Sequence, residues 1–245
     1  MINGKKVIVV FPAYNASRTL VKTFNEVPKG WVDGFILVDD FSTDDTVAVA
    51  KTLPIKVIQH PFNIGYGANQ KTCYLQALGE GADIIIMLHP DYQYDPKVIP
   101  ALIEPIASGE ARVVFASRML GGGALKGGMP PYKFLFNKVL TYLENLLLGT
   151  QYTEFHTGYR AYERSVLEAI PFLRNSNDFV FDSEMILQIV NRGITIHEIP
   201  IPTMYHSDAS SVNFVTSTVY GTKTLIAIGK YLLNRYGLRH APLFD

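Results

Sequence analysis

The sequence predicts an α/β domain with a mostly parallel central sheet and helices on both faces. Short runs of apolar, β-branched residues recur along the chain, and helical patterns separate them, which is typical of parallel strands joined by crossover helices. Several of these runs are apolar throughout, as expected for strands buried on both faces. Since 48% of the 245 residues are hydrophobic and 18% are charged, the composition is that of a folded protein with a substantial core.

The predicted elements alternate from the N-terminus onward. A strand over residues 6–11 ends at Pro12, and a second strand over 35–38 is followed by acidic residues that suit the first turn of a helix. The Gly- and Pro-rich segment 121–131 is expected to be a mobile loop. Further strands are expected at 55–59, 84–88, 113–116 and 194–201, and helices at 17–26, 65–79, from 96 onward, 132–148 and 219–236.

The composition excludes several classes of protein. With one cysteine, Cys73, the chain has neither a disulfide framework nor a cysteine-rich zinc site, and a reducing compartment is expected. The sequence shows neither an N-terminal signal region nor 18 consecutive apolar residues, so we expect a cytoplasmic protein without a transmembrane helix. Basic residues stand without acids in 111–143 and 209–244, which suits a site for anions. They match no nucleic-acid-binding module, so no nucleic-acid partner is expected.

Polar side chains follow two of the predicted strands at the point where each strand ends. Asp39 and Asp40 follow the second strand, and His89, Asp91 and Gln93 follow the fourth. In an open α/β sheet, ligands bind just beyond the carboxyl ends of the strands. We therefore predict a metal and diphosphate site at this edge. The chain lacks a complete dinucleotide-binding fingerprint and a Walker loop, which argues against a dehydrogenase.

Four motifs occur in order along the chain: Pro12-Ala13-Tyr14-Asn15, Asp39-Asp40-x-Ser42-x-Asp44-x-Thr46, Asn63-x-Gly65-x-Gly67 and Asp91-x-Gln93-x-x-Pro96. Together they resemble the family-2 glycosyltransferases of GT-A fold, and most closely the polyprenyl-phosphate sugar transferases of the dolichyl-phosphate mannose synthase type. The resemblance implies a single GT-A domain. Residues 1–120 would bind a nucleotide-sugar donor, residues 121–218 would form the acceptor side, and residues 219–245 would form a C-terminal amphipathic helix and tail.

The resemblance also implies which residues bind the donor. Asp39 would accept hydrogen bonds from the nucleobase or ribose. Asp40 would support the loop that holds the nucleobase and ribose, or it would support the donor sugar. Lys71 would reach a phosphate. The complete donor-binding set implied by the family is Pro12, Ala13, Tyr14, Asn15, Asp39, Asp40, Gly67, Lys71 and Asp91.

The family likewise implies a divalent cation, Mn²⁺ or Mg²⁺, bound by Asp91 with help from Gln93. Two positions depart from the family pattern, because Ala16 stands where Glu is usual and His89 stands where the D-x-D motif has Asp. Histidine suits Mn²⁺ better than Mg²⁺. Two interpretations stay open: His89 ligates the softer ion, or His89 only forms hydrogen bonds and Asp91 carries the metal. His206 is a further candidate for contacting the metal or diphosphate.

On the acceptor side, Arg118 and Arg160 are candidates for binding an acceptor phosphate, since convergent arginines bind phosphate bidentately. A second interpretation stays open for Arg160, which can instead pair with Glu163 or Asp182. If the acceptor is a hydroxyl group, a base is needed, and Asp182 or Glu184 is the candidate. The expected activity is inverting sugar transfer from a nucleotide-diphosphate sugar to an acceptor, with a polyprenyl phosphate favoured. The alternatives are a hydroxyl acceptor on a glycan or small molecule, and a nucleotide-sugar-binding protein without catalysis.

The helices at 132–148 and 219–236 combine apolar residues with Lys and Arg, and two interpretations stay open for each. Either helix can pack on its own domain or lie on the inner face of a membrane, where a lipid-phosphate acceptor would be found.

Overall fold

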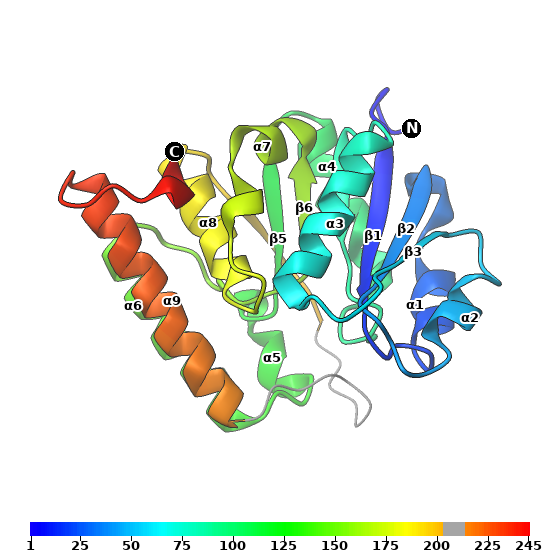
Figure 1. Cartoon of the computed structure of the whole chain (residues 1–245), viewed down its shortest axis with the longest axis horizontal. Helices are drawn as coiled ribbons and strands as arrows, with labels where there is room; N and C mark the ends of the chain where they lie inside the picture. The colour runs from blue at the N-terminus through cyan, green and yellow to red at the C-terminus, as the bar shows by residue number, and fades with distance from the viewer. Residues whose placement is uncertain (203–213) are drawn as a thin grey trace.

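The structure, a computed structural model, describes residues 1–202 and 214–245. Its centre is a seven-stranded sheet with the order β3-β2-β1-β4-β6-β5-β7 (Figure 1). All neighbouring strands are parallel except that β6 runs antiparallel to both β4 and β5. The strands are β1 (Val7–Ala13), β2 (Gly34–Asp39), β3 (Lys56–Gln59), β4 (Ile84–Met87), β5 (Val113–Ser117), β6 (Arg160–Glu163) and β7 (His197–Pro200). The predicted α/β fold with a mostly parallel sheet is confirmed.

Helices cover both faces of this sheet, as predicted (Figure 1). The two longest, α6 and α9, lie side by side and extend away from the strands (Figure 1). The α-helices are α1 (Leu20–Glu26), α2 (Thr46–Ala50), α3 (Tyr66–Gly79), α4 (Ile99–Ala107), α5 (Gly123–Lys126), α6 (Pro131–Leu148), α7 (Arg164–Ala169), α8 (Phe181–Asn191) and α9 (Phe214–Arg235). No helix in the described part of the chain is long and apolar enough to span a membrane.

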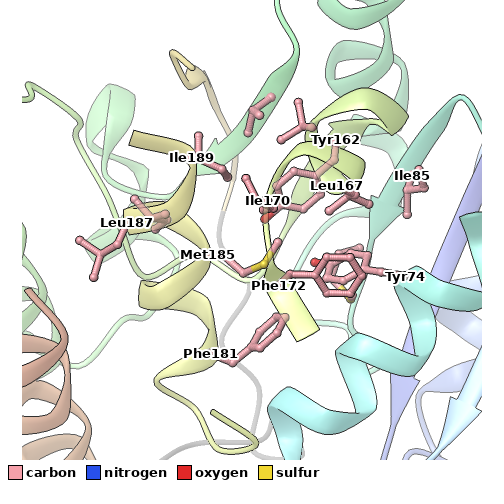
Figure 2. Close-up of a cluster of buried hydrophobic side chains, with 14 of the residues drawn as sticks. Tyr74, Ile85, Tyr162, Leu167, Ile170, Phe172, Phe181, Met185, Leu187 and Ile189 are labelled. Atoms are coloured by element: carbon pink, nitrogen blue, oxygen red, sulfur yellow. The ribbon is translucent and has the colours of Figure 1, made fainter. Parts of the chain in front are cut away.

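The side chains of β1 alternate between two apolar cores, one on each face of the sheet. Ile8 and Val10 join a cluster with residues of α3, α7, α8 and α9, part of which Figure 2 shows. Val9 and Phe11 join a second cluster with residues of α1, α2 and α4. Because both faces are covered, a strand of this sheet needs apolar residues at every position, which is why β1 and β4 are readily recognised in the sequence.

Strand β6 was not predicted, because its sequence, Arg160 to Glu163, begins and ends with a charged residue. It becomes a strand through pairing on both sides, with β4 and with β5. The strand state here is imposed by tertiary contacts and not by local propensity.

Residues 121–131, expected to be a loop, contain α5 and the start of α6. Ala124 and Met129 in this segment are buried and pack with Met119. A small apolar cluster therefore orders a Gly-rich segment whose composition alone favours a loop.

The contact between α3 and the segment before α8 requires glycine at its closest point. A Cβ added to Gly67 would lie 2.5 Å from the Ser176 carbonyl oxygen and 2.6 Å from Cβ of Phe181. The Gly67 amide also donates to the Asn177 carbonyl oxygen at 2.8 Å. Gly67 therefore has a packing role, in addition to the donor contact that the family resemblance implies.

We expect Gly67→Ala to destabilise the fold by about 1–3 kcal/mol, because a backbone carbonyl and Phe181 must shift to admit the new methyl group. Gly79→Ala, on the same helix, is the matched control: a Cβ there meets nothing within 4 Å, and alanine favours a helix by about 0.5–1 kcal/mol over glycine. Urea unfolding followed by circular dichroism measures both changes. Equal stability of the two variants would contradict the packing role.

Candidate active site

The carboxyl ends of β1, β2, β4 and β5 meet at one edge of the sheet, and the antiparallel β6 begins there. This arrangement brings Asp39, Asp91, Arg118 and Arg160 to the same edge, although they lie far apart in the sequence. The prediction that the polar groups following the strands share one edge is confirmed.

Strained backbone gathers at this edge. Asn15, Phe41 and Tyr92 follow β1, β2 and β4, and their φ angles are +53°, +64° and +59°. Positive φ is unfavourable for residues other than glycine, and such positions cluster at functional sites. Two hydrogen bonds join the loops after β1 and β2. The backbone N–H of Asn15 donates to Oγ of Ser42 at 2.8 Å, and the backbone N–H of Thr43 donates to Oδ1 of the Asn15 side chain at 2.9 Å.

A cavity of about 550 Å³ opens between this edge and helices α6 and α9. The residues that line it are mostly polar on the sheet side and α8 and mostly apolar on α6 and the segment just before it, although α6 also contributes Lys133 and Asn137. The polar residues include His89, Asp91, Gln93, Arg118, His156 and Asp182, and the apolar residues include Met129, Tyr132, Leu135, Phe136 and Val139.

His89 is held in this cavity by Tyr66. The two rings stack with centroids 5.5 Å apart. The Tyr66 hydroxyl lies 3.3 Å from Nε2 of His89 and donates to Oδ2 of Asp182 at 2.7 Å. Because its single proton goes to the carboxylate, the Tyr66 oxygen accepts from Nε2–H of His89, which leaves the lone pair on Nδ1. Burial lowers the pKa of His89, so the neutral form that this arrangement needs is favoured.

Asp91 and His89 are the candidate metal ligands in the cavity. Oδ1 of Asp91 accepts from the backbone N–H of Gln93 at 3.0 Å, which orients the carboxylate. Within residues 1–202 and 214–245, no group of three or more His, Cys, Asp or Glu side chains could hold a metal ion by itself. A carboxylate oxygen and an imidazole nitrogen nevertheless suit Mn²⁺ when a diphosphate supplies further oxygen ligands. His206 lies outside the described residues.

Arg160 does not line the cavity but lies beneath it, 1% exposed. Its guanidinium donates to Oδ1 of Asp182 at 3.2 Å and to the carbonyl oxygens of Thr157 and Phe155 at 2.7 and 3.2 Å. Of the two interpretations of Arg160, the structure therefore shows the ion pair with Asp182 and not a position facing an acceptor phosphate. This ion pair makes Arg160 a positioning residue for Asp182, the carboxylate that does line the cavity.

Glu184 is also directed elsewhere. Its carboxylate accepts from the Ser176 amide at 2.6 Å and from the Ser176 hydroxyl at 2.9 Å, and it is absent from the residues lining this cavity. Of the two carboxylates predicted as a base, only Asp182 faces the cavity.

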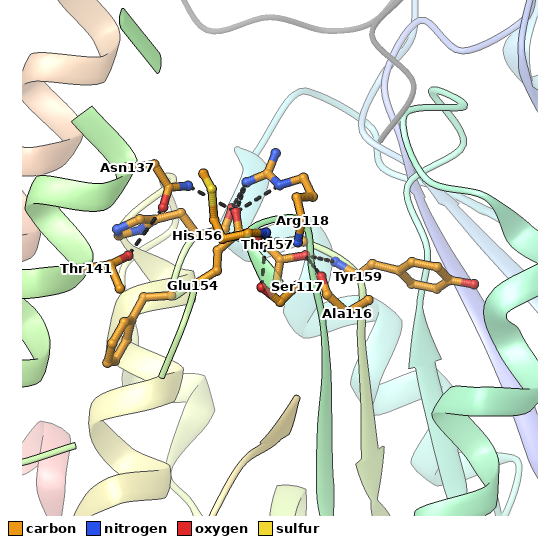
Figure 3. A network of polar contacts seen from close by, with 12 residues as sticks. Ala116, Ser117, Arg118, Asn137, Thr141, Glu154, His156, Thr157 and Tyr159 are labelled. Atoms are coloured by element: carbon orange, nitrogen blue, oxygen red, sulfur yellow. Dashed lines mark hydrogen bonds and ion pairs between the residues drawn. The ribbon is translucent and has the colours of Figure 1, made fainter. Parts of the chain in front are cut away.

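Arg118 belongs to a buried network around Glu154 (Figure 3). The Arg118 amide and its Nε donate to Glu154 at 2.7 and 2.8 Å, and Asn137 of α6 donates to the same carboxylate at 3.0 Å. Burial alone raises the pKa of Glu154, but the Arg118 charge and these hydrogen bonds outweigh it, so the pKa lies below its usual value. Glu154 thereby holds Arg118 at the cavity wall.

Lys133 of α6 is a cavity residue that sequence reasoning missed. Burial lowers its pKa, and the neighbouring Arg118 charge lowers it further, which shows that the two cations share one environment. The cationic pair at this cavity is therefore Arg118 and Lys133, not Arg118 and Arg160. The only signal in the sequence was the absence of acids between residues 111 and 143.

The predicted donor-binding residues that follow β1 and β2 divide into exposed residues and buried residues. Tyr14 is exposed and Asn15 lines a second cavity of about 620 Å³ between the loops after β1 and β2, whereas Pro12 and Ala13 are buried in β1. Asp39 is buried and accepts from the Ser42 amide at 3.0 Å.

Asp40 and Lys71 brace neighbouring loops. Asp40 accepts from the backbone amides of Ile64 and Gly65 at 2.9 and 3.0 Å, so it supports the loop before α3, a role that differs from the two that the family resemblance implies. Nζ of Lys71 donates to Oδ1 of Asn177 at 2.8 Å. This contact joins α3 to the segment before α8 and is a structural function separate from the phosphate contact that the family resemblance implies.

The chain is similar in sequence to known glycosyltransferases. Residues 8–170 match the model of glycosyl transferase family 2. The chain is 27% identical to the UDP-N-acetylglucosamine–dolichyl-phosphate N-acetylglucosaminyltransferase of Methanococcus voltae, over 93% of this chain and 98% of that protein. It is 26% identical to the polyprenol monophosphomannose synthase of Mycolicibacterium smegmatis, over 80% of this chain and 77% of that protein.

Among solved structures, the glucosyl-3-phosphoglycerate synthase of Mycobacterium tuberculosis in complex with UDP superposes with a TM-score of 0.74 at 19% identity, over 97% of this chain and 82% of that one. This likeness confirms the GT-A fold. Because the family model covers most of the chain, from β1 to the end of α7, the protein belongs to glycosyl transferase family 2 and is a glycosyltransferase.

Proposed function

We propose that the protein transfers a sugar, with inversion, from a nucleotide-diphosphate donor to a polyprenyl phosphate. The observation that carries this proposal is that the cavity has a mostly polar wall at the sheet edge and a mostly apolar wall on α6, where Lys133 lies close to Arg118. A polyprenyl phosphate has the same division, with an anionic head and an apolar chain. The relatives named for dolichyl phosphate and polyprenol support the same acceptor class.

In this proposal the first half of the domain, residues 1–120, binds the donor, and residues 121–218 contribute the acceptor side. The loops after β1 and β2 would hold the nucleoside, with Tyr14, Asn15 and Asp39 as its contacts. The diphosphate would lie toward Asp91, between the second cavity and the first.

Asp91 and Nδ1 of His89 would hold a divalent cation, and the donor set fits Mn²⁺ better than Mg²⁺. When bound, such an ion neutralises the charge that develops on the leaving diphosphate. Tyr66 fixes the His89 tautomer, and the backbone N–H of Gln93 orients Asp91. The structural neighbour is known with Mn²⁺ and UDP-glucose and with Mg²⁺ and UDP, which supports a divalent cation at this site.

A lipid phosphate is ionised at neutral pH, so its oxygen can attack the anomeric carbon without a general base. Arg118 and Lys133 would bind that phosphate and orient it. With a hydroxyl acceptor in its place, Asp182 would have to act as base, because it is the carboxylate of the predicted pair that faces the cavity.

The proposal is tested by incubating the protein and Mn²⁺ with a panel of nucleotide sugars and either a short-chain polyprenyl phosphate in detergent or glycan acceptors. Mass spectrometry should detect a product in which the sugar is attached to the lipid phosphate. Transfer to glycan hydroxyl groups alone would contradict the proposal and favour Asp182 as a base.

We expect Lys133→Gln to raise KM for the polyprenyl phosphate about 10- to 100-fold, since a hydrogen bond to a charged group contributes about 1.5–3 kcal/mol. Donor affinity should stay unchanged. Lys138→Gln is the matched control, because Lys138 lies on the same helix but outside the cavity lining. Steady-state kinetics with detergent-solubilised acceptor measures both variants. An equal effect at the two lysines would refute a specific phosphate contact.

Replacing His89 by Asp should lower the preference for Mn²⁺ over Mg²⁺ by about tenfold or more, because an all-oxygen donor set favours the harder ion. Asp91→Asn is the companion variant and should weaken binding of both ions. Isothermal titration calorimetry of each ion in the presence of UDP reports the preference without turnover. If His89→Asp leaves the ratio unchanged, His89 only forms hydrogen bonds and Asp91 alone is the protein ligand.

A further inference from the structure

An apolar stripe runs along the exposed side of α6. It consists of Tyr132, Leu135, Val139, Tyr142 and Leu146, which are 50, 64, 51, 66 and 66% exposed. Their spacing of three and four residues places them on one face of the helix. A continuous row of large apolar side chains on a surface marks an interaction site, whereas scattered exposed residues do not.

The opposite face of α6 is already occupied by its own domain. Leu140, Thr141, Glu144 and Leu148 are buried there. Helix α9 packs closely alongside, since a Cβ on Gly221 would lie 2.8 Å from Cζ of Phe136. The stripe is therefore not the packing face of the helix, and intramolecular packing does not account for its residues.

The charges on α6 identify the kind of partner. Its single acid, Glu144, is 2% exposed, and a carboxylate oxygen lies 3.0 Å from Nε2 of His156, so it adds nothing to the surface charge. Lys138 is exposed beside the stripe. A surface that combines large apolar residues with cations and lacks exposed acids suits an anionic lipid bilayer. Two copies of it would bring like charges together, which disfavours self-association.

The stripe is continuous with the cavity. Tyr132, Leu135 and Val139 line the cavity as well as the exposed face, and Tyr142 and Leu146 extend the row beyond it. At a rise of 1.5 Å per residue, the stripe is about 21 Å long. It therefore connects the apolar wall of the cavity to the outer surface of the protein.

We propose that the α6 stripe docks on an anionic membrane surface and sets the cavity mouth at the bilayer, where a lipid phosphate can enter sideways. The inference rests on the proposed function for the identity of that lipid. It places membrane contact on α6 because the apolar stripe is continuous with the cavity there.

Co-sedimentation with vesicles tests the inference. The wild-type protein should bind vesicles that contain phosphatidylglycerol and bind pure phosphatidylcholine vesicles less. The double variant Tyr142→Ser, Leu146→Gln should lose at least about tenfold in partitioning, because two large apolar contacts are removed. The control is Leu75→Gln, Leu173→Gln, which alters two leucines that are 46 and 53% exposed elsewhere on the surface and should bind like the wild type.

Transfer to a short-chain acceptor in detergent separates this inference from the proposed function. Tyr142 and Leu146 lie outside the cavity lining, so both double variants should keep wild-type activity there. Wild-type vesicle binding by the α6 variant would overturn the docking surface, as would a wild-type dimer that this variant converts to monomer. Vesicle binding through α6 without transfer to any polyprenyl phosphate would overturn the proposed function alone.

Discussion

The ion pair between Arg160 and Asp182 is the contact on which the site depends, because it joins the sheet to α8 beneath the cavity. A full charge at 1% exposure must be paired, and removing one partner of such a buried pair costs about 3–5 kcal/mol. The same guanidinium donates to the carbonyl oxygens of Phe155 and Thr157. It therefore also sets the path of the segment that carries His156 to the cavity wall.

Beside this buried pair, a second buried ion pair joins Arg118 and Glu154, and α6 supplies further residues that the acceptor would contact. Glu154 neutralises Arg118 and holds it at the wall, with Asn137 of α6 completing the network. Lys133 comes from the same helix, which also contributes the apolar wall and the exposed stripe. In the proposed function, one helix thus recognises both the anionic head and the apolar chain of the acceptor and brings the cavity to the membrane.

Much of this site was predictable because its residues follow apolar strands. The carboxyl ends of parallel strands must share an edge, so Asp39, Asp91 and Arg118 were expected together before any contact was known. Gly67 and Lys71 were harder, because a motif position does not say what lies opposite it. Both turn toward the segment before α8, more than 100 residues away in the sequence, and no local pattern predicts that contact.

The sequence by itself determined the fold class, the family and the edge where polar groups gather, because buried strands and strand-end motifs leave local signatures. Only the tertiary structure decided which charges face the cavity. Arg118, Lys133 and Arg160 are all cations of the second half, yet burial and pairing with Asp182 take Arg160 out of the cavity, whereas α6 brings Lys133 into it. The physical reason is that the availability of a charge depends on its partners and its depth, which long-range packing sets.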